Sequence, residues 1–211
     1  MAMQVDLRVL ELICSRLCHE LISPVSAVNN GLELIADGGA DMLYEVSELL
    51  TSSAGEASGV LQFYRIAYGL GGQDATPISV GEAKRLTEGL LRDGKVKLGW
   101  TLGDPGSDAG LGRRGMKLLL NALAIAIDAL PRGGSLTVTT DPASRSVTID
   151  AAGKGARVEP ASRDAYAHAI AVDALTARNV HAYFTSLIAA DVGGTLETTE
   201  EPDRVVLRLK F

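Results

Sequence analysis

The chain has 211 residues and a formal net charge of -6, and 46% of its residues are hydrophobic. This length suffices for one large domain or two small ones with hydrophobic cores. The acidic balance argues against a general nucleic-acid binder, because neutralising phosphates requires surplus Lys and Arg. No apolar run approaches the roughly 20 residues that cross a bilayer, and the N-terminus lacks a signal-peptide pattern. We therefore expect a cytoplasmic protein with neither a nucleic-acid nor a membrane partner.

Two long helices are predicted before residue 72. In the first, mostly apolar residues recur at alternating steps of three and four, which is a heptad seam. A second seam follows from Leu43 to Tyr68. A lone pair of helices about 45 Å long buries little surface, so we expect a homodimer that forms a four-helix bundle. The seam of the first helix comprises Leu7, Leu10, Cys14, Leu17, Leu21, Pro24, Val28, Gly31 and Ile35.

After a glycine-containing joint at residues 71–77, β-rich runs alternate with helical ones. The expected fold class is α+β, with a helical hairpin over residues 1–72 and an α/β sandwich over residues 79–211. The predicted strands are Val96–Leu102, Ser135–Thr140, Ser146–Ala151, Gly194–Thr199 and Arg204–Phe211. The predicted helices are Ile78–Arg92, Leu111–Leu130, Arg163–Ala174 and Asn179–Val192.

When Cys14 and Leu21 take the first heptad position, His19 falls at the sixth. This position lies farthest from the seam. Several of its neighbours on the helix are small, which leaves the imidazole accessible to a partner. An ordinary imidazole, with a pKa near 6.5, is mostly neutral at pH 7 and is an established nucleophile. The predicted contact residues around His19 are Ser15, Arg16, Ile22, Ser23 and Ser26.

Glu20 and Pro24 add to the case for His19. The Glu20 carboxylate is suited to accept a hydrogen bond from one ring nitrogen and so fix which nitrogen is free. Pro24 cannot donate to the Glu20 carbonyl, so the helix is expected to bend just after His19. By itself, however, a single exposed histidine on a helix is usually an ordinary surface residue.

The spacing His19-Glu-Leu-Ile-Ser-Pro24 resembles the H-box of sensor histidine kinases. In such kinases the histidine accepts phosphate, and the helical hairpin is followed by an α/β domain that binds ATP. The C-terminal part of this chain stands where that domain belongs. The resemblance implies that His19 is a phosphoacceptor.

The nucleotide motifs of the kinases are altered in this sequence. Asn121 matches the asparagine that holds Mg²⁺ with ATP, but Lys117 replaces the acidic residue one turn earlier. The Asp-x-Gly-x-Gly motif has an extra residue here, between Asp150 and Gly153. The lid, glycine-rich in kinases, corresponds to residues 173–184, which contain no glycine. We expect ATP binding to be lost.

An intact H-box with a damaged nucleotide site resembles the ChpT-type histidine phosphotransferases of bacterial phosphorelays, and residues 16–34 resemble their first helix. The resemblance implies a dimer whose His19 takes phosphate from the receiver domain of a hybrid kinase and passes it to response regulators. By position, the resemblance implies that Glu20 orients the imidazole. The resemblance also implies no cofactor or metal of the protein's own, with Mg²⁺ supplied by the receiver.

Two alternatives stay open at this point: an active sensor kinase with unusual nucleotide motifs, and a non-enzymatic dimeric scaffold that binds receivers. The remaining histidines, His168 and His181, are expected to be surface or capping residues. Cys14 and Cys18 are expected to be reduced thiols, and two thiols are too few for a zinc site.

Overall fold

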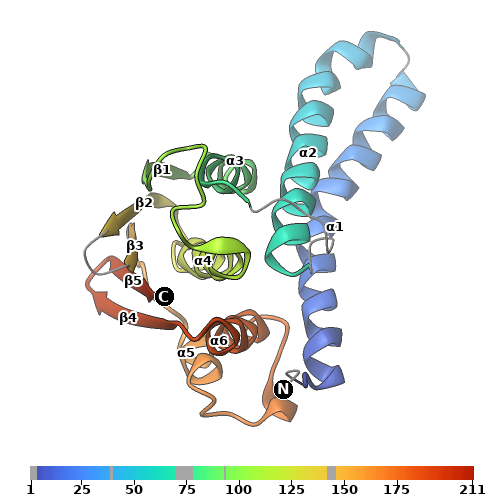
Figure 1. Cartoon of the computed structure of the whole chain (residues 1–211). Helices are drawn as coiled ribbons and strands as arrows, with labels where there is room; N and C mark the ends of the chain where they lie inside the picture. The colour runs from blue at the N-terminus through green and yellow to red at the C-terminus, as the bar shows by residue number, and fades with distance from the viewer. Residues whose placement is uncertain (1–3, 39, 70–77, 93, 142–145) are drawn as a thin grey trace.

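The computed structural model describes residues 4–38, 40–69, 78–92, 94–141 and 146–211. Two long helices, α1 (Leu7–Gly38) and α2 (Ala40–Ala67), form an antiparallel hairpin beside an α/β body (Figure 1). Both predicted helices are thereby confirmed. α1 continues through Pro24, and Figure 1 shows its two halves running in different directions.

The α/β body contains a five-stranded sheet in the order β1-β2-β3-β5-β4. β1 pairs with β2 in parallel, through a crossover that contains α4, and the other pairs are antiparallel. In Figure 1 the helices α3, α4 and α6 lie between the sheet and the hairpin. The elements are α3 (Val80–Leu90), β1 (Val96–Thr101), α4 (Gly112–Asp128), β2 (Gly134–Asp141), β3 (Ser146–Ala152), α5 (Pro160–Tyr166), the 3-10 turn η1 (Val172–Ala174), α6 (Val180–Val192), β4 (Thr195–Glu201) and β5 (Arg204–Lys210).

The predicted fold class and all five strands are confirmed. The predicted helix Arg163–Ala174 is wrong, because α5 begins at Pro160 and ends at Tyr166. His168 adopts a left-handed backbone with φ of 54°, which a helix cannot continue through. The predicted joint at residues 71–77 lies outside the described residues, so the domain boundaries remain a prediction.

α4 is the centre of the hydrophobic core. Its residues from Leu118 to Ala126 are buried except for part of Ile125, which is 8% exposed. One continuous cluster of buried side chains joins α4 to Leu136 and Ile149 of the sheet and to Phe63 of α2. The half of the hairpin nearer the body therefore shares its core with the body.

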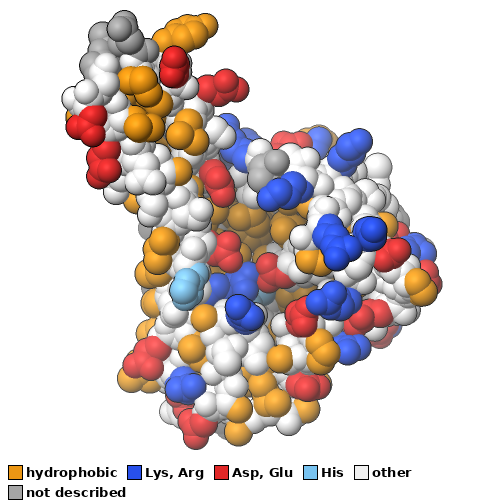
Figure 2. Space-filling model, turned by 180° about the vertical axis from the view of Figure 1, so that it is seen from behind, with side chains coloured by type: hydrophobic (Ala, Val, Ile, Leu, Met, Phe, Trp, Pro, Cys, Tyr) orange, Lys and Arg blue, Asp and Glu red, His pale blue; other side chains and the backbone are white. Residues whose placement is uncertain are grey.

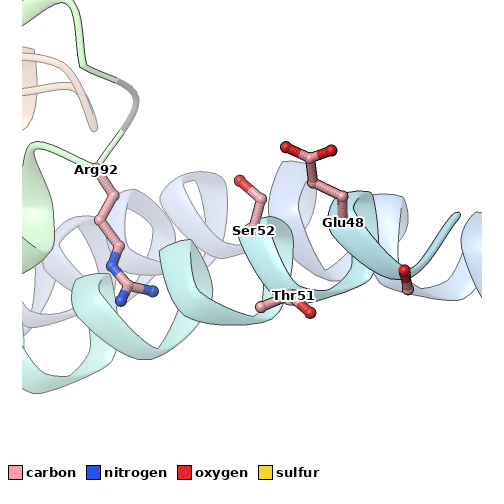
Figure 3. A pocket seen from close by; sticks show the side chains of 5 residues that line it. Glu48, Thr51, Ser52 and Arg92 are labelled. Carbon is pink, nitrogen blue, oxygen red and sulfur yellow. The ribbon is translucent and has the colours of Figure 1, made fainter.

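The backbones of α2 and α3 meet at two glycines. A Cβ at Gly59 would lie 2.1 Å from the carbonyl oxygen of Gly89, whereas a Cβ at Gly89 would lie 3.6 Å from its nearest neighbour. Close by, Arg92 lies against Gly55, where there is no Cβ to displace it. Arg92 also borders a shallow hollow of about 410 Å³ along α2, with Ser47, Glu48, Thr51 and Ser52 (Figure 3).

The glycine contact predicts opposite effects for two alanine substitutions. Gly59→Ala should lower the free energy of unfolding by roughly 1–3 kcal/mol, since the helices must move apart. Gly89→Ala has room for its methyl group and should raise it by up to about 1 kcal/mol, through helix propensity. Urea unfolding of both variants checks this, and equal effects would contradict the close approach of α2 and α3.

Candidate functional site

His19 lies on the exposed side of α1, next to the α/β body. Four of the five predicted contact residues are also exposed: Ser15, Ile22, Ser23 and Ser26. Within the described part of the chain, neither ring nitrogen of His19 makes a hydrogen bond. Figure 2 shows a histidine at the surface beside a hollow between the hairpin and the body, with charged side chains in the hollow. The imidazole is therefore open to an approaching partner.

Arg16 differs from its prediction. Its side chain is only 9% exposed and turns toward the body, where Nη2 donates a hydrogen bond to Oδ2 of Asp128 at 2.7 Å. It belongs to a second buried stripe on α1, with Val9 and Ile13, that is separate from the heptad seam. The heptad pattern places Arg16 outside because it describes packing between helices of a bundle only, while the α/β body covers this outer face.

Glu20 lies one turn after Arg16, and its Oε1 is 3.8 Å from Arg16 Nη2. Burial raises the pKa of Glu20, and the nearby Arg16 guanidinium opposes that shift. Burial is the largest single influence on the pKa of Arg16 and lowers it, but Asp128 together with Tyr64 and Tyr68 outweighs burial and keeps the pKa above its ordinary value. Arg16 thus stays charged between two carboxylates.

A cavity of about 430 Å³ lies between α1, α4 and α6. Arg16 and Asp128 form part of its wall, and Arg157 and Arg178 line it as well. Part of its wall comes from residues 176–182, within the stretch that matches the kinase lid. Its further lining residues are Ile125, Ala129, Val158, Glu159, Ala161, Ser162, Thr176, Asn179, His181 and Ala182.

The two motif residues on α4 face the hairpin. Asn121 is completely buried, and its Nδ2 donates to the carbonyl oxygen of Ala67 at 2.7 Å. Lys117 Nζ donates to the carbonyls of Tyr68 and Gly69, both at 3.2 Å. These carbonyls follow the last turn of α2, where backbone acceptors lack helical partners and a cation is favourable. Asn121 and Lys117 thus cap the C-terminal end of α2.

The other two motifs are also occupied by protein contacts. Asp150 binds Arg204 of the neighbouring strand, with Oδ1 3.0 Å from Nε and Oδ2 2.8 Å from Nη2. At the start of the region that matches the lid, the carbonyls of Leu175 and of Val172, which directly precedes the region, accept hydrogen bonds from Arg8 of α1, each at 3.2 Å.

The prediction that His181 is a surface or capping residue is wrong, because the residue is only 1% exposed. Its Nε2 lies 3.0 Å from the Asn121 carbonyl oxygen, and its Nδ1 lies 2.8 Å from the Tyr68 hydroxyl. A carbonyl only accepts, so Nε2 carries the proton and Nδ1 accepts from Tyr68. Burial, with a contribution from Arg16, lowers the pKa of His181 to about 3. The apolar helix around it was the sequence signal for burial.

The pKa of His181 predicts how stability depends on pH. Since the folded pKa is far below the unfolded value near 6.5, the unfolded chain binds the proton first, and stability falls as pH drops below 6.5. Between pH 7.5 and 5, the wild type should lose about 2 kcal/mol more than His181→Gln. Urea unfolding at both pH values measures this difference. Equal losses would mean that folded His181 takes up a proton.

Three comparisons with known proteins agree with this architecture. A family model described as "Histidine phosphotransferase C-terminal domain" matches residues 80–204. The protein phosphotransferase ChpT of Brucella abortus (strain 2308) is 39% identical over 198 residues, which is 92% of each chain. A solved structure of a bacterial phosphotransferase superposes with a TM-score of 0.78 at 31% identity, covering 99% of this chain and 98% of the other.

The matched region spans more than half of the chain, and the relative covers nearly all of it. The chain therefore belongs to the histidine phosphotransferase family. Within that family it is of the ChpT type, as the H-box and the altered nucleotide motifs predicted.

Proposed function

We propose that the protein is a phosphorelay histidine phosphotransferase in which His19 carries the phosphoryl group between receiver-domain aspartates. One contrast carries the proposal. His19 is exposed among small exposed side chains, whereas the residues that match the nucleotide motifs are engaged in protein contacts. A donor other than bound ATP fits this arrangement. The receiver of a hybrid kinase supplies it, and response regulators accept the phosphate.

The proposed step begins with a lone pair on a ring nitrogen of neutral His19 attacking the phosphorus of a receiver aspartyl phosphate. An N–P bond forms, and the P–O bond to the aspartate breaks, which releases its carboxylate. The ring becomes cationic, and Glu20 accepts a hydrogen bond from its other N–H. In the reverse direction, a second receiver's carboxylate attacks phosphorus and the N–P bond breaks. Mg²⁺ bound by the receiver neutralises charge on the phosphoryl oxygens.

The contact surface is proposed to comprise Ser15, Ile22, Ser23 and Ser26 around His19. Arg16 contributes beneath this surface instead of on it, because its guanidinium is buried. No helix in the described part of the chain is long and apolar enough to cross a membrane. We keep the cytoplasm as the proposed location, where receiver partners are met.

The central test is transfer of labelled phosphate from a phosphorylated receiver domain. Wild-type protein should gain an acid-labile, base-stable phosphate and pass it to a second receiver, whereas His19→Ala should gain none. His168→Asn is the matched control, because it removes another exposed histidine and asparagine tolerates the left-handed backbone there. Uptake of label by His19→Ala would overturn the proposal.

The same assay separates the alternative functions. Labelled ATP and Mg²⁺ without a receiver should leave the wild type unlabelled, and labelling would support the sensor kinase. Receiver binding without transfer in either direction would support the scaffold.

A homodimer is also proposed, because one chain leaves much of its apolar hairpin surface uncovered. Leu7, Leu10 and Leu43, all seam residues, are more than half exposed. A groove of about 500 Å³ runs along the first turns of α1 and includes Leu7, Leu10 and Cys14. Figure 1 shows the far half of the hairpin extending beyond the body, and exposed Leu32 lies on α1. A second copy would cover these side chains in a four-helix bundle.

The dimer proposal predicts that a charge on the hairpin's apolar side separates the subunits. Leu32→Glu should shift the protein toward monomer in sedimentation analysis, since burying two carboxylates in the bundle is unfavourable. Asn30→Glu places the same charge on α1 at an exposed position away from the seam, and should stay dimeric. A dimeric Leu32→Glu protein, or a monomeric wild type, would contradict the proposed interface.

A further inference from the structure

The charged group beneath His19 joins the hairpin to the C-terminal body. Arg16 of α1 lies between the carboxylates of Glu20, on its own helix, and Asp128, in the last turn of α4. The two contacts are unequal: Nη2 is 2.7 Å from Asp128 Oδ2 but 3.8 Å from Glu20 Oε1. Asp128 thus holds the guanidinium and leaves Glu20 only weakly paired.

Arg16 has donor capacity that the structure does not use. Its Nε is buried without a hydrogen-bond partner among the described residues. An unpaired buried donor is unfavourable, so the guanidinium would take another acceptor if its present one were weakened. Glu20, one turn away and about 40% exposed, is the neighbouring carboxylate within reach. The two carboxylates therefore compete for one cation.

We propose that Asp128 is a positioning residue for phosphotransfer, because it retains Arg16 and so keeps the Glu20 carboxylate available to the imidazole of His19. This inference rests on the proposed function of His19 and Glu20. It gives the C-terminal body a part in the chemistry without any nucleotide: a residue 112 positions from Arg16 in sequence sets the surroundings of the phosphoacceptor.

Weakening Asp128 should therefore act through Glu20. Asp128→Asn keeps the size of the side chain but removes its charge, so Arg16 turns to Glu20 and pairs with it closely. The carboxylate then accepts less readily from the imidazole. Asp128 is half-exposed, so the asparagine amide stays solvated and the substitution leaves no cavity.

The experiment measures phosphate transfer from a labelled receiver to the full-length protein. For Asp128→Asn we expect a maximal rate about tenfold lower, less than the 10²–10⁴-fold effect of a general base, with an unchanged receiver concentration at half-maximal rate. Asp128→Glu retains the carboxylate and should restore the rate. Asp150→Asn breaks another carboxylate–arginine pair of the same body, with Arg204, and should transfer like the wild type.

A double-mutant cycle identifies the route of the effect. Glu20→Gln lowers the rate by itself, and adding Asp128→Asn should lower it little further, because the carboxylate on which Asp128 acts is gone. If the two substitutions instead lowered the transfer rate independently, so that their fold-losses multiplied in the double variant, that result would overturn the inference. So would a loss in Asp128→Asn that Asp128→Glu does not restore, or one that appears only as weaker receiver binding.

The outcomes separate the inference from the function on which it rests. If the wild type transfers phosphate through His19 and Asp128→Asn is equally fast, the inference alone is wrong. If the wild type takes up no phosphate, the proposed function is wrong and the inference falls with it. Circular dichroism and thermal unfolding of each variant show that a slow protein is a folded one.

Discussion

The placement of the hairpin against the α/β body depends on the hydrogen bonds that cap the C-terminal end of α2. The carbonyls of Ala67, Tyr68 and Gly69 lie against α4, and Asn121 and Lys117 donate to them. Buried backbone acceptors must be paired, so these hydrogen bonds favour one placement of the hairpin over others that bury similar apolar area. Because α4 is the centre of the core, that placement is transmitted to the whole body. The covered face of α1, the cavity beside it and the open side of His19 follow from it.

The same residues stand at positions where the kinases that the sequence resembles have nucleotide motifs. An acidic side chain at position 117 would attract Mg²⁺, but it would be repelled by the negative end of α2. A lysine at this position repels Mg²⁺ and is attracted by the negative end of α2. Burial lowers the pKa of Lys117, while Asp191 favours its charged form. Similarly, Asp150 stands where the kinases that the sequence resembles have an aspartate that reads adenine, and here its carboxylate is paired with Arg204. The departure from the nucleotide motifs and the gain of a fixed interface are thus two consequences of the same side chains.

The charged groups near His19 extend this view from architecture to chemistry. Arg16 is buried, charged and shared between the hairpin and the body. Its neighbours Tyr64 and Tyr68 are held neutral, since burial raises the pKa of both hydroxyls, for Tyr64 to about 12. His181, with its lowered pKa, is neutral as well. Among these groups, the charge beneath His19 is therefore confined to the Arg16 cation and the two carboxylates of Asp128 and Glu20, which compete for it.

The sequence by itself determined the strands, the two long helices and the exposure of His19, because these follow from local periodicity. The five strands fall within a few residues of their predicted bounds, and the sixth heptad position of His19 is exposed as expected. The tertiary structure alone decided that Arg16 is buried. A heptad reports the packing of a helix against its bundle partners, and it carries no information about the body that covers its outer face. Arg16 meets Asp128 only because the fold brings together residues 112 positions apart, and no pattern within one helix encodes that contact.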